Sequence, residues 1–201
     1  DEESFSLAEH DADGEEALPE TTSTADARNV GDYVTFAFTG SYRKQPLLMS
    51  QRVVDKDAQG IVIEYAFTEG KAHDVWRVRT NTTSGAIHAV SHQEGDAFVD
   101  ASVAEFEQRL GQTVFVADEN EALVRADKQN LAIAGKDLEV ERSTYRVRIG
   151  NKSGTLTTWT LPGFAWGDVG GELVAAGKTV YKAELVDLGQ AKGQTASLSL
   201  E

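Results

Sequence analysis

Hydrophobic and polar residues alternate along most of the chain after its N-terminal segment. In DYVTFAFT, the apolar residues Val34, Phe36 and Phe38 fall at every second position. In IVIEYAFT, the same spacing runs from Ile61 to Phe67. A period of two places such side chains on one face of a β-strand. Runs of this kind are separated by turns rich in Gly, Asp, Asn and Ser, and together they predict an antiparallel meander.

One segment interrupts the alternation and predicts a short helix near 102–110. Ser102 and Glu105 have the spacing of a capping box, which satisfies free amide groups at the start of a helix. Apolar residues then recur at helical spacing. Gly111 is expected just beyond the C-terminal end of this helix.

Strand patterns resume after the helix, first as the short runs TVFVA, ALVRA and NLAIA, and bring the total to about eleven strands. In LEVERSTYRVRI, the apolar phase slips, because Leu138 and Val140 share one parity whereas Tyr145 and Val147 share the other. A bulge or strand break within 141–144 would reconcile the two phases. The sequence therefore predicts an all-β, mainly antiparallel fold, as a strongly curved sheet, a barrel or a sandwich.

Charge is concentrated at the N-terminus. The chain has a net charge of −14, and residues 1–27 contain ten acidic residues and no Lys or Arg. This composition cannot bury enough apolar surface to offset the entropy of ordering, so 1–27 is predicted to be a disordered acidic linker. A single antiparallel β domain over 28–190 and a C-terminal tail over 191–201 are expected to follow. An acidic chain has no electrostatic attraction to nucleic acid.

Several kinds of chemistry are disfavoured. The chain has no cysteine, which excludes disulfides and thiolate catalysis, and no apolar run approaches the roughly 20 residues of a transmembrane helix. His88 and His92 lie on a predicted strand about 13 Å apart, too far to share one metal ion. No nucleophile elbow and no HExxH motif is present. We therefore expect no enzyme activity, no cofactor and no metal site.

The stretch TLTTWTLPGFAWGDVGGELV is rich in aromatic residues and glycine. A phosphate-binding loop would require a following helix and fixed Lys or Ser/Thr positions, and neither is indicated here. The Pro-Gly and Gly-Gly pairs instead predict a bent connection between strands. Its aromatic residues Trp159, Phe164 and Trp166 would either close the core or rim a ligand cavity.

An arginine pattern occurs twice. WRVRTNTTSG and YRVRIGNKSG share an aromatic-Arg-Val-Arg motif and, four residues later, Ser-Gly. In each, the aromatic residue and Val are expected to be buried while Arg77 and Arg79, or Arg146 and Arg148, occupy the opposite face. These arginines would pair with acids across the sheet, reflect an internal duplication, or form an interaction face for an acidic partner.

The span from VGDYVTFAF to GELVAAGKTVYKAELVDLG, residues 30–189, resembles uncharacterised bacterial secreted proteins and lipoproteins. Its architecture is similar to that of periplasmic lipoprotein carriers, whose curved sheet wraps an apolar cavity. The resemblance implies an exported protein, periplasmic or at the cell surface, with a membrane tether at its N-terminus. The leading hypothesis is a non-enzymatic binding or carrier protein for an apolar ligand. The alternative is a structural or interaction protein that binds another protein through the arginine face or a sheet edge.

Overall fold

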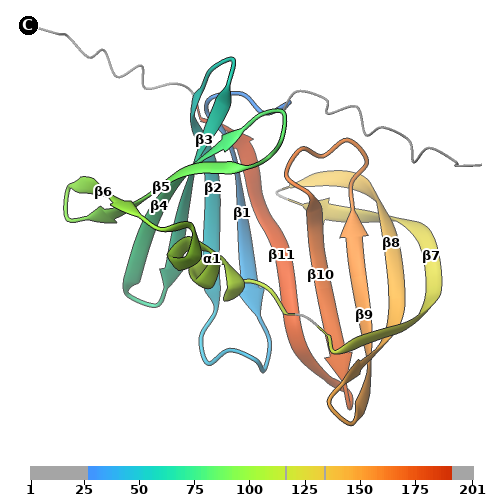
Figure 1. Ribbon diagram of the computed structural model, residues 1–201. Coiled ribbons are helices and arrows are strands. Elements are labelled where there is room, and N and C mark those ends of the chain that lie inside the picture. The colour runs from blue at the N-terminus through green and yellow to red at the C-terminus, as the bar shows by residue number, and fades with distance from the viewer. Residues whose placement is uncertain (1–26, 116, 134, 192–201) are drawn as a thin grey trace, which may run out of the picture.

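The computed structural model describes residues 27–115, 117–133 and 135–191 (Figure 1). The predicted linker and C-terminal tail therefore lie, except for residues 27 and 191, outside the described residues. Within the described ranges the chain forms eleven strands and one helix: β1 (Asp32–Thr39), β2 (Leu47–Lys56), β3 (Gly60–Glu69), β4 (Ala72–Asn81), β5 (Ile87–Glu94), β6 (Ala97–Ala101), α1 (Val103–Gly111), β7 (Glu119–Ile133), β8 (Lys136–Ile149), β9 (Lys152–Thr160), β10 (Asp168–Ala175) and β11 (Lys178–Gln190).

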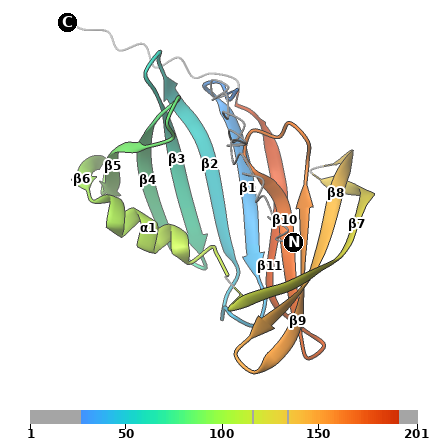
Figure 2. The same cartoon turned by 45° about the vertical axis from the view of Figure 1, so that its right-hand side comes forward.

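All described strands belong to one antiparallel sheet with the order β6-β5-β4-β3-β2-β1-β11-β10-β9-β8-β7. The first and last strands pair with each other in the middle of the sheet, and β6 and β7 form its edges. The sheet is strongly curved but open, and α1 crosses its concave face on the way from β6 to β7 (Figures 1 and 2). The predicted all-β fold is confirmed, and a single curved sheet is the form that it takes.

The main core lies on the concave face, where the period-two residues of neighbouring strands meet. Phe36 pairs with Met49 of β2 and with Leu185 of β11, so their side chains share this face. The same register continues outward through β3 and β4 to β5. The buried apolar residues that this half of the sheet contributes to the main cluster are Val34, Phe36, Phe38, Leu47, Met49, Phe67, Trp76, Val78 and Val90.

Helix α1 begins at the predicted capping box and covers part of this core. The Ser102 hydroxyl accepts a hydrogen bond from the Glu105 amide at 3.2 Å, and the Glu105 carboxylate accepts one from the Ser102 amide at 2.8 Å. Phe106 is buried, with its ring 4.9 Å from that of Tyr65. The prediction for Gly111 is wrong by one residue, because it ends the helix and Gln112 is the cap.

Strand β8 is regular through the segment where the sequence predicted a bulge. Its register with β9 is unbroken over 141–149, and the irregularities lie instead in the facing strand, β7. Val140 and Val147 are both fully buried although they point to opposite faces. The phase slip therefore arises because β8 is covered on one face near its start and on the other face near its end.

Strand β7 is longer than the sequence suggested. The predicted short strands ALVRA and NLAIA form one 15-residue strand, and TVFVA is not a strand over its described residues. Two register shifts, one after Asn120 and one after Leu123, accommodate the strand against β8. The strand bends so far that it comes back into contact with β11.

Candidate ligand-binding site

The aromatic loop between β9 and β10, residues 161–167, crosses one end of the concave face. Trp166 packs against a buried apolar cluster on β2 and β3, although β11 and β1 lie between β10 and these strands. The guanidinium of Arg28 stacks on the Trp166 ring at 4.8 Å. Strand β10 follows the loop directly, so no helix presents amides to a phosphate. The cluster beneath Trp166 consists of Val53, Ile61 and Ile63.

Beside this loop, the concave face contains an open-sided cavity of about 420 Å³. Strands β1, β2, β9, β10 and β11 supply its floor, and the segment 113–115 after α1 lies at its other end. A volume of this size lies within the range of small-molecule sites. The apolar part of the lining is formed mainly by Phe36, Phe38, Met49, Phe115, Leu156 and Trp166.

The two glycines at the start of β10 have different roles. Gly171 pairs with Ala183 and Thr158, and all three residues line the cavity. A Cβ atom at Gly171 would meet only the Thr157 carbonyl oxygen, at 3.4 Å, so this glycine leaves open space in the floor. A Cβ atom at Gly170 would lie 2.7 Å from the Ala183 carbonyl oxygen, so Gly170 permits close backbone packing.

Tyr181 closes the cavity at the end opposite to the aromatic loop. Its hydroxyl donates a hydrogen bond to the Thr113 carbonyl oxygen at 3.0 Å, which ties β11 to the segment after α1. Its ring lies 5.3 Å from that of Tyr42 and 6.2 Å from that of Phe115. Burial raises the pKa of Tyr181 to about 12, with smaller contributions from Tyr42 and Asp168. The phenol is therefore neutral at physiological pH.

Four polar side chains interrupt the apolar lining: Gln51, Thr113, Thr158 and Asp168. Gln51 lies opposite Val34 near the start of β1, and Asp168 is the first residue of β10. Both are thus nearer to the aromatic loop than to Tyr181. The Thr113 hydroxyl donates a hydrogen bond to the Leu110 carbonyl oxygen at 2.7 Å. Among the described residues, the side chains of Gln51, Thr158 and Asp168 have no hydrogen-bond or ion-pair partner.

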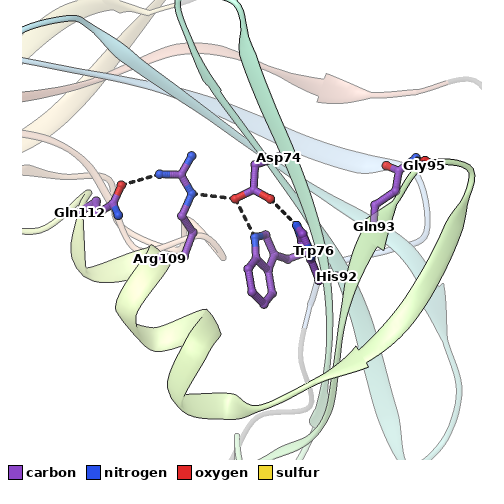
Figure 3. A network of polar contacts seen from close by, with 7 residues as sticks. All are labelled: Asp74, Trp76, His92, Gln93, Gly95, Arg109 and Gln112. Carbon is purple, nitrogen blue, oxygen red and sulfur yellow. Dashed lines mark hydrogen bonds and ion pairs between the residues drawn. The ribbon is translucent and has the colours of Figure 1, made fainter.

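A polar network holds α1 on the sheet next to this cavity (Figure 3). The Asp74 carboxylate on β4 accepts hydrogen bonds from Trp76 Nε1 at 2.9 Å, His92 Nε2 at 2.6 Å and Arg109 Nε at 2.8 Å. Arg109 also bonds to the Gln112 side chain at the helix end. One carboxylate therefore connects α1 with two strands.

The charge of this carboxylate is favoured despite its partial burial. Burial by itself would raise the pKa of Asp74, but hydrogen bonds from Trp76 and His92 and the positive charge of Arg109 outweigh it. The net effect is a lowered pKa. Asp74 is therefore ionised at neutral pH and serves as the anionic centre of the network.

The three aromatic residues predicted as ligand contacts do not share one site. Trp166 lines the 420 Å³ cavity and a second groove of about 300 Å³, and Phe164 lines only the second groove. Trp159 pairs with Gly170 and alternates with Thr158, so it points to the opposite face of β9. There it lines a cavity of about 310 Å³ with residues of β7.

The four predicted arginines do not form one face either. Arg77 and Arg79 lie on β4, Arg146 and Arg148 lie on β8, and six strands separate β4 from β8. Arg77 bonds to Glu64 of β3 at 2.9 Å, which matches the cross-strand pairing that the sequence suggested. Arg79 likewise pairs with the Asp57 carboxylate.

The two arginine segments also differ in structure beyond their shared motif. Ser84 and Gly85 lie in the connection between β4 and β5, where Gly85 has a φ of +69°. Ser153 and Gly154 lie inside β9. The repeated letters therefore do not mark equivalent positions in two copies of one unit.

The part of the chain that the structure describes lacks two other features that would indicate a function. It contains no group of three or more His, Cys, Asp or Glu side chains arranged to hold a metal ion. No described helix has the length and hydrophobicity needed to cross a bilayer.

Sequence reasoning missed the residues that shape the cavity and fix the helix. Tyr181 and Gly171 had no signal beyond the ordinary strand pattern and the Gly-Gly pair. Asp74 and Arg109 are 35 residues apart in the sequence. No local motif could have associated them, because their contact depends on how α1 lies across the sheet.

Comparison with known proteins gives only loose likenesses. No family model matches the chain, and neither does any curated protein. A Bacteroides fragilis protein described as exported, with a YmcC-like fold, is 10% identical with a TM-score of 0.41, covering 81% of this chain and 97% of its own. The hypothetical protein CT021 from Chlamydia trachomatis is 8% identical with a TM-score of 0.46, and the match covers 83% of this chain and 90% of CT021. The Mycobacterium tuberculosis lipoprotein LppX is 12% identical with a TM-score of 0.36, and the match covers 78% of this chain and 85% of LppX.

These neighbours agree with the loose resemblance to exported, lipoprotein-type β proteins found in the sequence. Identities of 8–12% and TM-scores below 0.5 carry no argument about a ligand.

Proposed function

We propose that the protein binds an apolar molecule in the cavity on its concave face and acts as a non-enzymatic binding or carrier protein. The observation that carries this proposal is the 420 Å³ space between the aromatic loop and Tyr181. Apolar and aromatic side chains form most of its lining, and the missing side chain of Gly171 deepens its floor. Mostly apolar walls with a few polar groups are typical of small-molecule sites.

The chemistry of the lining supports binding rather than catalysis. Its titratable groups are Asp168 and Tyr181, and the Tyr181 phenol stays protonated at neutral pH. The described lining therefore offers no pair of groups with the proximity of a nucleophile and its base. A largely apolar and aromatic surface instead favours burial of hydrocarbon.

The proposal is tested by filling the cavity. Replacing Gly171 with Leu places a side chain in the open floor, where only one atom lies within contact distance of the new Cβ. Binding of the neutral fluorescent probe N-phenyl-1-naphthylamine should be lost while the melting temperature changes little. The matched control is Thr155→Leu, which adds a leucine at an exposed position of β9 outside this cavity. Failure of the wild type to bind the probe, or unchanged binding by Gly171→Leu, would overturn the proposal.

The proposed role includes export to the periplasm or cell surface, with the acidic segment 1–27 as the tether to a membrane. The exported and lipoprotein neighbours are in keeping with this location. Cell fractionation with an antibody against the β domain should place the protein outside the cytoplasm. Recovery in the cytoplasmic fraction alone would contradict it.

A second function, binding of another protein along the edge strand β7, is favoured by two exposed apolar side chains. Leu123 is 57% exposed and Val124 is 58% exposed, next to one of the register shifts of this strand. An edge strand also presents backbone groups that can pair with a partner strand. Replacing Val124 with Lys should abolish any complex formed there without affecting the binding of the naphthylamine probe.

A further inference from the structure

The cavity has a polar end and an apolar end. Asp168 lies two residues beyond Trp166, at the end covered by the aromatic loop, and Gln51 lies on the same half of the lining. Phe115, Leu156 and the Tyr181 ring lie toward the other end, where the hydroxyls of Thr113 and Tyr181 already donate hydrogen bonds to backbone carbonyl oxygens. An elongated ligand in this cavity would therefore meet polar groups at one end and hydrocarbon at the other.

The Asp168 carboxylate is the one charged group of the described lining, and nothing in the described chain neutralises it. Its side chain takes part in none of the ion pairs of the sheet, in contrast to Asp74 and Asp127. Asp168 is an exposed residue that lines the cavity, so a ligand can reach its carboxylate, and desolvation by the surrounding protein raises its pKa. A carboxylate in this position gains free energy when a cation or hydrogen-bond donor approaches it.

The influence of this charge extends into the cavity. Asp168 contributes to the raised pKa of Tyr181, so its charge is felt at a side chain that lines the same space. The aromatic faces nearby would also attract a cation. Trp166 already does so on one side, where Arg28 stacks on it at 4.8 Å. A ligand with an anionic head group would be repelled by Asp168.

We propose that the ligand is an amphiphile with a protonated amine, whose ammonium group lies at Asp168 and whose hydrocarbon chain extends along Phe36 and Phe38. The unpaired Gln51 side chain offers an additional hydrogen-bond acceptor for the ammonium group. This inference rests on the proposed function, since it assigns a class of ligand to the same cavity.

The test compares three molecules with the same twelve-carbon chain: dodecylamine, dodecanol and dodecanoate. Each displaces N-phenyl-1-naphthylamine from the wild-type protein at pH 7, where an alkylamine is protonated as a lysine side chain is. The amine should bind about fivefold more tightly than the alcohol, as expected for one partly exposed charge-assisted hydrogen bond. Dodecanoate should bind more weakly than the alcohol.

Replacing Asp168 with Asn should remove the preference for the amine and leave the affinity for dodecanol unchanged. The matched control is Asp100→Asn, which removes an exposed carboxylate from β6 outside the cavity and should preserve the preference. Equal binding of the three molecules, or a preference that survives in Asp168→Asn, would overturn the amine assignment while the proposed function stands. If none of the three displaces the probe, both proposals fail.

Discussion

Replacing Asp74 with Asn should destabilise the protein, because this carboxylate connects α1 with β4 and β5. It accepts three hydrogen bonds of 2.6–2.9 Å, from Trp76, His92 and Arg109. Hydrogen bonds to charged groups contribute about 1.5–3 kcal/mol each. The Asp74 side chain is 25% exposed, and an amide keeps one of the two acceptor oxygens, so the full sum is not expected. We expect a loss of about 2–4 kcal/mol in the free energy of unfolding, which corresponds to a melting temperature lower by roughly 5–15 °C.

Thermal and urea unfolding followed by circular dichroism would measure this loss. Asp100→Asn serves as the control, since its exposed carboxylate lies on the edge strand β6. A double-mutant cycle with Arg109→Met would show how much of the loss in the free energy of unfolding is due to the contact between Asp74 and Arg109 of the helix. Hydrogen exchange should also become faster for the amides of α1. A loss no larger than that of the control would refute the reasoning that this network holds the helix.

The same group predicts how stability depends on pH. The folded protein lowers the pKa of Asp74 below that of the unfolded chain. The contribution of the Asp74 charge to the stability of the fold is therefore complete above the ordinary Asp pKa of about 4. It is lost as the pH falls through the lowered pKa that Asp74 has in the folded protein. The difference in stability between the wild type and Asp74→Asn should be constant near neutral pH and should shrink in acid. A difference that grows in acid would contradict this sign.

Three further substitutions test the packing of the sheet. Trp166→Ala should lower the free energy of unfolding by about 1–3 kcal/mol, less than for a fully buried tryptophan, because Trp166 packs on the β2–β3 cluster. It should also weaken binding of the naphthylamine probe, because Trp166 lines the cavity. Trp76→Ala should lower the free energy of unfolding, measured by urea unfolding, by about 3–5 kcal/mol, because Trp76 is only 8% exposed. Replacing Arg77 and Arg79 together with Ala should shift the melting temperature by less than about 3 °C, since their ion pairs are partly exposed to water.

The success of the sequence prediction on β1, β3 and β4 has a physical basis. The core residues of these strands lie on one face, so burial imposes a period of two on them, although in β4 Val75 on the opposite face is buried as well. The capping box is equally local, because Ser102 and Glu105 satisfy each other within one turn. Such features depend on neighbours in the sequence and can be predicted from it.

Strand β8 shows why a local pattern can mislead. Its change of apolar phase has the form expected of a bulge, yet the strand is regular. Val140 is covered on one face and Val147 on the other, because the sheet curves and β7 bends back toward β11. A phase change thus has two physical causes, an extra residue in the strand or a change of the covered face. Only the three-dimensional path of the neighbouring strand distinguishes them.

The cavity itself illustrates a related limit. Phe36 and Phe38 follow the same alternation as the residues of the packed core, because lining a cavity and filling a core both require apolar side chains on one face. What differs is the cover: over β3 and β4 the Phe106 side chain of α1 fills the concave face. Over β9 to β11 the segment 113–115 and the aromatic loop border an open space, and Gly171 contributes no side chain. The space for a ligand therefore results from where one short helix ends, a property that no strand pattern encodes.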